Sequence, residues 1–281
     1  MCTYCSNHAL RKLTDGRYVR FRSPANIIAE IRDIAESMTA KKEIYLEVET
    51  FGADQSWARE LFAGLKNLNQ ELPMPIAYGA NIRVTPGVDF NELFAACRDA
   101  NFRFINIGLE SGSDRVRREV LKRYYANEDI IRTVKLARSY GLQVALFNMV
   151  GLPTETPADF QQTIDVNREC QPDWHMTSIF YPYPGTDLYT LCKDMNLLPA
   201  TTADSTERVE SVLNMTQFDK RQVQKAFIWF DWNVYKDHRP WYKLLLRVVA
   251  TKLRTKPRLH YVYRNLTKLA FIKKIKGKLK S

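Results

Sequence analysis

Five short apolar runs, separated by amphipathic segments of helical length, most limit how this chain of 281 residues can fold. The runs cover residues 43–48, 75–80, 102–108, 142–150 and 174–180. Consecutive runs lie about 30 residues apart, which is the size of a βαβ unit. Between them, apolar residues repeat at helical spacing, as at Ile27, Ile31 and Ile34. This alternation predicts an α/β protein with a parallel sheet, either open and doubly wound or curled into a barrel.

Polar or glycine-bearing segments follow the strand-like runs. They are Glu47–Gly52, Ala80–Arg83, Gly108–Ser113, Gly151–Pro157 and Tyr181–Thr186. Taken singly, any of them is an ordinary turn with a helix cap. Because the carboxyl ends of parallel strands meet at one edge, the five segments together indicate a ligand site there. Glu47 and Glu49 share one strand face, which points into a polar site or, at an edge strand, into solvent.

A CxxC pair, Cys2 and Cys5, stands at the amino terminus. Three interpretations are open for it: half of a zinc site, a redox pair, or part of an iron–sulfur ligand set. The chain has no second CxxC and no suitably spaced histidine pair, and the pair precedes the first strand-like run. The zinc and redox interpretations therefore lack their usual context.

Cysteine usage and hydropathy bear on where the protein resides. Five cysteines at irregular spacing argue against a disulfide framework and predict a reducing, cytoplasmic compartment. No apolar run reaches the ~18 residues of a membrane-spanning helix, and the first residues lack a signal-peptide pattern. Cys97, Cys170 and Cys192 fall on helices and are expected to be inert thiols. His8 and His175 are expected to serve packing and hydrogen bonding.

Basic residues are concentrated at the end of the chain. Residues 238–281 contain fourteen of the 42 Lys and Arg residues and no Asp or Glu, so the rest of the chain is close to neutral. Leu245, Val249 and Leu253 share one helix face there, a pattern typical of helices on an anionic membrane surface. A solvated basic face packed on the body is the alternative. A nucleic-acid partner is not expected, because no recognition motif for one is present.

Several motifs in order resemble the radical S-adenosylmethionine (SAM) superfamily, in particular its branch with a cobalamin-binding domain. That branch includes the magnesium-protoporphyrin monomethyl ester cyclase type and radical methyltransferases. The resemblance runs from Cys2 to about Cys192 and rests on five segments: CTYC at 2–5, EVETF at 47–51, GLESGS at 108–113, NMVGLPTET at 148–156 and YPYPGT at 181–186. It implies a partial (β/α) TIM-like barrel over residues 1–200, a helical extension over 201–237 and the basic amphipathic tail over 238–281.

The resemblance also implies cofactors and roles. Cys2 and Cys5 are expected to ligate a 4Fe–4S cluster that cleaves SAM to a 5′-deoxyadenosyl radical, with an electron donor such as flavodoxin or ferredoxin. Cobalamin is expected only through a further amino-terminal domain. The residues expected to bind SAM are Glu47, Glu49, Arg83, Glu110, Ser111, Val150, Gly151 and Tyr181. The implied reaction is cobalamin-dependent methylation or ring formation on an unactivated carbon of a small-molecule or lipid-like substrate.

The sequence departs from the family at its first cysteine. The family pattern CxxxCxxC would place that residue three positions before Met1, and the first barrel strand is likewise expected upstream. Two explanations follow: the chain is truncated at the amino terminus, or it is a short relative without cluster chemistry. The second corresponds to a different function class, a non-catalytic barrel that binds or scaffolds. With two cysteines alone, weak cluster binding or none is expected.

Overall fold

The computed structural model describes residues 2–16, 18–37, 43–47, 51, 54–199 and 207–255. All five predicted strands are present: β1 (Glu43–Leu46), β2 (Ala77–Ile82), β3 (Phe102–Glu110), β4 (Gln143–Val150) and β5 (Trp174–Ile179). They form one sheet in the order β1-β2-β3-β4-β5, and every neighbouring pair is parallel. The sheet is a half-barrel, which confirms the predicted α/β class and partial (β/α) barrel.

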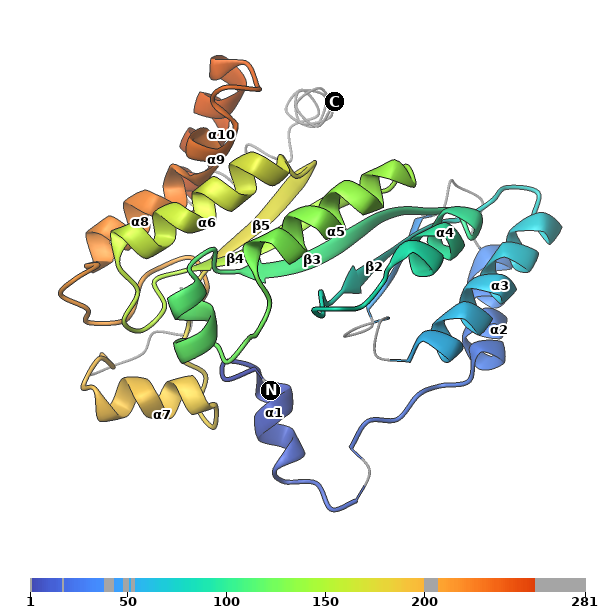
Figure 1. Ribbon diagram of the computed structural model, residues 1–281, viewed down its shortest axis with the longest axis horizontal. Coiled ribbons are helices and arrows are strands. Elements are labelled where there is room, and N and C mark those ends of the chain that lie inside the picture. Colours follow the sequence, from blue (N-terminus) through green and yellow to red (C-terminus); the bar gives the residue numbers. More distant parts are fainter. Residues whose placement is uncertain are drawn as a thin grey trace.

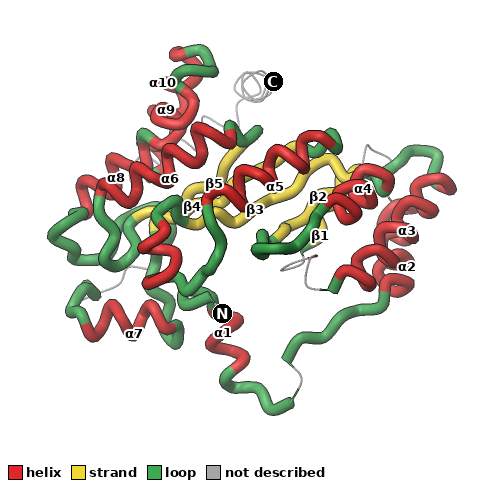
Figure 2. The backbone as a smooth tube through the Cα atoms, viewed as in Figure 1, coloured by secondary structure: helices red, strands yellow, loops and turns green. Residues whose placement is uncertain are grey.

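Helices connect the strands in the order that the sequence predicts (Figure 1). Before β1 lie α1 (Ser6–Arg11) and α2 (Pro24–Ser37); between the strands lie α3 (Gln55–Glu71), α4 (Asn91–Asp99), α5 (Asn127–Ser139) and α6 (Pro157–Cys170). After β5 come α7 (Asp187–Asp194), α8 (Lys220–Ile228), α9 (Phe230–Tyr235) and α10 (Trp241–Arg254). In Figure 2 the amino terminus, α1 and α7 lie on the opposite side of the sheet from α5 and α6.

Hydrogen-bonded caps fix where the helices begin. At α6 the Thr156 hydroxyl accepts from the backbone amide of Asp159 at 3.1 Å, and the Asp159 carboxylate accepts from the Thr156 amide at 3.0 Å. Pro157 occupies the first turn, where its missing amide proton costs nothing. At α3 the Asp54 carboxylate accepts from the amide of Trp57. These caps place each helix start directly after the loop that leaves a strand.

The core has two parts. One cluster packs the sheet against α2 to α5 and includes Leu65, Ile105 and Leu146, each fully buried. The other packs β4 and β5 against α6 and the helices after β5, and includes Val150, Val223 and others. Some residues on the other face of the half-barrel, such as Tyr45 and Met176, are exposed.

The helices after β5 pack on the barrel through buried contacts. Burial of Val223, Phe227 and Phe230 ties α8 and α9 to β4, β5 and α6. Within the predicted helical extension, α8 and α9 thus pack against the outer side of the barrel. Within the part of the chain that the structure describes, no helix is both long and apolar enough to cross a bilayer. Residues 256–281 of the predicted basic tail lie outside the described residues.

Candidate functional site at the barrel mouth

The CxxC loop is tied to the carboxyl-terminal end of the half-barrel at Thr3. The buried Thr3 hydroxyl donates to the Val120 carbonyl at 2.7 Å, and the Thr3 carbonyl accepts from the amide of Leu188 at 3.0 Å. Cys2 and Cys5 flank this anchor as partly exposed thiols. Both cysteines are therefore held at the barrel mouth and stay accessible.

Three residues next to the loop form a buried cluster of charged and polar groups, here called the mouth cluster: Tyr4, Glu110 and Arg123. Arg123 Nη1 donates to the Tyr4 hydroxyl and to Glu110 Oε1, both at 2.8 Å. The Arg123 and Glu110 side chains are 7% and 15% exposed. Burial, and then the charge of Glu110, raise the pKa of Tyr4 well above its usual range, so its hydroxyl stays protonated. The ion pair is desolvated, which strengthens its electrostatics.

Glu110 has a strained backbone at the end of β3. Its φ is 59°, in the left-handed region that residues other than glycine rarely adopt, and the pairing of β3 with β4 shifts register between Gly108 and Glu110. Such strain persists only where surrounding contacts impose it, and it gathers at functional sites. The shift re-aims the Glu110 side chain toward the mouth, because this residue lines the pocket described next.

A pocket of about 310 Å³ opens between the CxxC loop and the ends of β3, β4 and β5. Its wall is apolar on the strands and polar at the rim. The lining residues are Tyr4, Cys5, Ser6, Glu110, Phe147, Asn148, Met149, Met176, Ser178, Ile179, Phe180, Tyr181, Tyr183 and Arg208. A thiol and a carboxylate thus share one half-enclosed cavity with aromatic and thioether side chains.

Of the residues predicted from sequence, Cys5, Glu110 and Tyr181 line this pocket. Cys2 adjoins it through the turn in which the Cys5 amide donates to the Cys2 carbonyl at 3.4 Å. Glu47 and Arg83 are both exposed and do not line it. Glu49 lies outside the described residues.

Ser111, Val150 and Gly151 are buried behind the pocket, and their polar groups have internal partners. The Ser111 hydroxyl accepts from the Ser113 amide, the Val150 carbonyl from the Phe180 amide, and the Gly151 amide donates to Glu155. Gly151 has a φ of 79°, and a Cβ there would lie 2.9 Å from Val223 of α8. The close approach that glycine permits at this position is made by α8.

Two residues of the mouth cluster were not predicted from the sequence. Tyr4 stands within the CxxC, where nothing distinguishes it from a spacer. Arg123 reaches Glu110 because a π-helical turn at Val116–Val120 and a left-handed Lys122, with a φ of 53°, fold the segment after β3 back on itself. Neither feature has a sequence signature.

The other three cysteines are buried, and His8 and His175 lie beside polar groups. Burial raises the pKa of the Cys97 thiol strongly, and that of Cys170 and of Cys192 to about 12. His175 faces α9, with its ring nitrogens near Asp231 and Thr177. His8 lies 3.4 Å from the Asp187 carboxylate.

The donor set at the mouth fits two thiolate positions of an iron–sulfur cluster. Cys2 and Cys5 are accessible, neighbouring and soft ligands, as iron requires. Among the residues that the structure describes, no group of three or more His, Cys, Asp or Glu side chains is arranged to hold a metal ion. The described part of the chain therefore supplies two ligands of the three in the family pattern.

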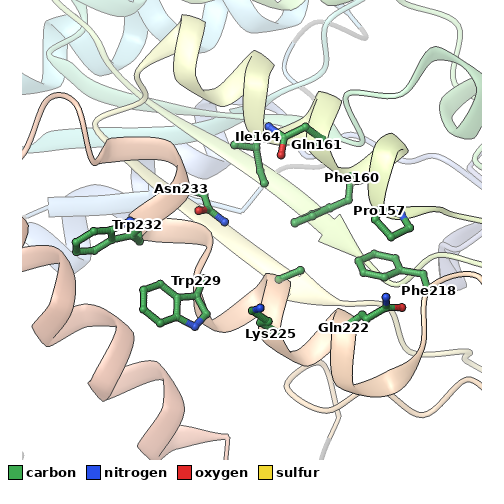
Figure 3. Close-up of a pocket in the computed structure, with 11 residues that line it drawn as sticks. Pro157, Phe160, Gln161, Ile164, Phe218, Gln222, Lys225, Trp229, Trp232 and Asn233 are labelled. Atoms are coloured by element: carbon green, nitrogen blue, oxygen red, sulfur yellow. The ribbon is translucent and has the colours of Figure 1, made fainter.

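Two larger grooves lie away from the mouth, around α8. One, of about 650 Å³, runs between α6 and the α8–α9 segment and is shown in Figure 3, where Trp229, Trp232 and Phe160 line it. The other, of about 670 Å³, lies between α8 and α10. Neither contains a cysteine or a carboxylate of the mouth cluster.

The fold and the site define a parallel half-barrel protein with a CxxC loop and a carboxylate at the carboxyl ends of its strands. A model of the radical SAM superfamily matches residues 1–166, more than half of the chain. The chain belongs to the radical SAM superfamily, a family of enzymes.

Curated relatives are similar over most of the chain. An uncharacterized methyltransferase of Pyrococcus horikoshii is 26% identical over 80% of this chain and 46% of the relative. A tRNA-2-methylthio-N(6)-dimethylallyladenosine synthase of Caldicellulosiruptor saccharolyticus is 31% identical over 66% of this chain and 39% of the relative. The chain spans less than half the length of these two relatives.

Solved structures share the fold. The radical SAM methyltransferase TsrM of Kitasatospora setae, with cobalamin and a 4Fe–4S cluster bound, has a TM-score of 0.59 and 17% identity, over 89% of this chain and 50% of that chain. The cobalamin-dependent radical SAM enzyme OxsB has a TM-score of 0.59 and 14% identity, over 98% and 49%. The predicted resemblance to the cobalamin-dependent branch agrees with these neighbours in fold.

Proposed function

We propose that this chain is the SAM-binding half-barrel of a radical SAM enzyme that forms a 5′-deoxyadenosyl radical at the barrel mouth. The observation that carries the proposal is the shared pocket: Cys5 of the CxxC loop and Glu110 of β3 line the same cavity. The family match makes SAM the expected ligand. The strain at Glu110 and its re-aimed side chain are further support.

Different residues at the mouth would bind the cluster and SAM. Cys2 and Cys5 would hold a 4Fe–4S cluster through their thiolates. A bound cluster supplies the electron that cleaves SAM into methionine and a 5′-deoxyadenosyl radical. Glu110 provides a carboxylate acceptor for hydroxyl or ammonium protons of SAM, and Arg123 balances its charge. Phe147, Met149 and other apolar wall residues exclude water from the cavity.

Iron binding at the cysteines is the first test. Anaerobic reconstitution followed by iron and sulfide analysis is expected to give little cluster with the chain as written. A chain lengthened so that a cysteine stands four positions before Cys2 is expected to give a stoichiometric cluster. Cys5→Ala abolishes any cluster in either chain, whereas the buried Cys97→Ala leaves it unchanged. A lengthened chain that gains no cluster contradicts the assignment of the thiols.

SAM binding is tested separately, without relying on turnover. Glu110→Gln keeps the shape and an acceptor for Arg123 but removes the charge. It is expected to lower SAM affinity about tenfold in equilibrium dialysis, the loss of one charge-assisted hydrogen bond. Glu47→Gln, at an exposed residue outside the pocket, is the matched control and is expected to bind as the wild type. Equal affinity for all three proteins contradicts SAM binding at this pocket.

A non-catalytic barrel is the second candidate, favoured by the two-thiol donor set within the described residues. It predicts SAM or substrate binding with no cluster even in the lengthened chain.

The proposal extends to the reaction, the use of cobalamin and the electron donor. Relatives are named for methyl and methylthio transfer, so methylation or ring formation on an unactivated carbon is the proposed outcome. TsrM and OxsB were determined with cobalamin bound, and addition of hydroxocobalamin to reconstituted protein tests whether this chain also uses it. Flavodoxin or ferredoxin is the proposed electron donor.

A further inference from the structure

Helix α10 is apolar on two sides, one of which is exposed. Leu244 and Val248 are buried against the body. Five large apolar side chains of the same 14-residue helix stay 40–65% exposed: Trp241, Tyr242, Leu245, Leu246 and Val249. Single exposed apolar residues are ordinary, but a continuous stripe of them marks an interaction site. This set of five residues is called the α10 stripe below.

The α10 stripe continues into the groove of about 670 Å³ between α8 and α10. Leu245 and Val249 belong to both, and Ile228 and Trp229 extend the apolar floor. Trp229 is itself 37% exposed. The groove and the stripe therefore form one apolar surface that spans two helices.

Cations surround this surface. Lys220, Arg221 and Lys225 of α8 and Lys252 of α10 line the groove and are exposed. Glu210 is the single acidic residue in the lining, and none of the four cations forms an ion pair with a residue that the structure describes. Helix α10 contains four Lys or Arg and no Asp or Glu. An apolar floor inside a cationic rim is complementary to lipids with acyl chains and anionic headgroups.

The neighbouring groove in Figure 3 shows that this pattern is specific to α10. It also has aromatic walls, and it shares Lys225 and Trp229 with the α8–α10 groove. Its other polar residues are the carboxamides Gln161, Gln222 and Asn233. One cation does not form a rim, so that groove has no charge complementarity for an anionic surface.

We infer that the α10 stripe and the cationic rim of the α8–α10 groove form a docking face for an anionic membrane surface. Trp241 and Tyr242, at the start of α10, are the amphipathic side chains that settle at the headgroup level. Leu246 and Val249 then enter the acyl boundary, while Arg221 and Lys252 meet headgroups. The face lies on the helices after the barrel, so it does not depend on whether the mouth cluster binds SAM.

Vesicle co-sedimentation with the full chain tests the face. The wild type is expected to sediment with phosphatidylcholine–phosphatidylglycerol vesicles at low salt, and much less at high salt or with phosphatidylcholine alone. Leu246→Gln with Val249→Gln is expected to lower partitioning about tenfold. This variant keeps the nine Lys and Arg residues of 256–281. A decrease in its vesicle binding is therefore attributed to the docking face and not to the basic tail. Leu13→Gln, at a site that is 83% exposed, is the apolar control.

A second pair of variants tests the rim. Arg221→Gln with Lys252→Gln is expected to weaken binding severalfold and to flatten its salt dependence, whereas Lys193→Gln on α7 leaves both unchanged. Circular dichroism and urea midpoints confirm that the variants fold. The proposal is overturned if Leu246→Gln with Val249→Gln binds vesicles as well as the wild type does. It is also overturned if the wild type is a dimer in solution and this variant is a monomer, or if the variant loses binding to tRNA while its binding to vesicles is unchanged.

Discussion

Two buried groups of charged residues lie on opposite faces of the same sheet, and they are built differently. The mouth cluster, Tyr4, Glu110 and Arg123, lies where β3 to β5 open toward the CxxC loop. The outer cluster, defined as His175, Asp231 and Arg247, joins β5 to α9 and α10. Adjacent residues of a strand face opposite ways, so His175 points outward where Met176 lines the pocket.

The polar atoms of the outer cluster are paired. Asp231 Oδ1 lies 2.8 Å from Arg247 Nη1 and 3.3 Å from His175 Nε2, and His175 Nδ1 lies 3.0 Å from the Thr177 hydroxyl. Burial raises the pKa of Asp231, but hydrogen bonds and charges from His175 and Arg247 outweigh it, and the pKa lies well below its usual range. A fully paired cluster of this kind fixes one element on another.

The mouth cluster, by contrast, has unused hydrogen-bonding capacity and strain. Arg123 Nε is buried without a partner, and Glu110 has its φ at 59°. Both features cost stability, and features of this kind gather at functional sites. The less satisfied of these two buried charge clusters is therefore the better candidate for a binding site.

Breaking the outer cluster is expected to have the largest effect. Asp231→Ala leaves His175 and Arg247 without their shared carboxylate and lowers the free energy of unfolding by about 3–5 kcal/mol. Asp237→Ala, which removes a surface pair with Arg168, costs less than about 1 kcal/mol and is the control. Urea unfolding midpoints measure both. If the two variants lose a similar free energy of unfolding, the outer cluster does not hold α9 and α10 on β5.

The sheet was predictable because its signal is local. Each strand is an apolar run between turn residues, and the parallel order follows from helices of sufficient length between them. The CxxC loop and Glu110 were likewise visible as short motifs. Thr156 and Asp159 form the capping box that their spacing indicates.

The rest depended on contacts between distant residues. A Cβ at Gly151, one of the residues expected to bind SAM, would lie 2.9 Å from Val223, which is 72 residues away along the chain. The hydroxyl of Ser111, another residue expected to bind SAM, accepts from the Ser113 amide. Arg123 meets Glu110 only through an irregular π-helical turn. A strand motif identifies the edge of the sheet that binds ligand, but packing decides which of its polar groups remain available.

Glu155 offers a test of what an unpaired buried atom costs outside the lining of the mouth pocket. Its Oε2 accepts from the amides of Gly151 and Leu152, whereas Oε1 is buried without a partner. Burial raises its pKa to about 8, against the opposing effect of those two hydrogen bonds. The folded protein therefore keeps this proton up to about pH 8, while the unfolded chain releases it near its ordinary value of 4.5.

The stability contributed by protonated Glu155 is thus complete below about pH 4.5 and is lost as the pH rises toward 8. Glu155→Gln keeps an acceptor for the two amides and stays uncharged. Relative to the wild type it is expected to be similar in stability at pH 5 and more stable by at least about 1 kcal/mol at pH 8. Urea unfolding at both pH values measures this. Glu36→Gln, on the exposed side of α2, is the control. If Glu155→Gln and the wild type differ in free energy of unfolding by the same amount at both pH values, the raised pKa of Glu155 is contradicted.

The smallest expected effect concerns the tie that holds the CxxC loop to the mouth. Thr3→Val keeps the side-chain shape but removes the 2.7 Å hydrogen bond to the Val120 carbonyl. The buried carbonyl then has no partner for that bond, which lowers the free energy of unfolding by about 1 kcal/mol. The backbone bond from Leu188 remains, so the loop loosens without detaching. Alkylation of Cys2 and Cys5, followed by peptide mass spectrometry, is expected to accelerate severalfold, with the three buried cysteines as internal standards. Thr14→Val removes an exposed bond to Leu10 and leaves the rates unchanged; equal rates in both variants mean that Thr3 does not set the position of the thiols.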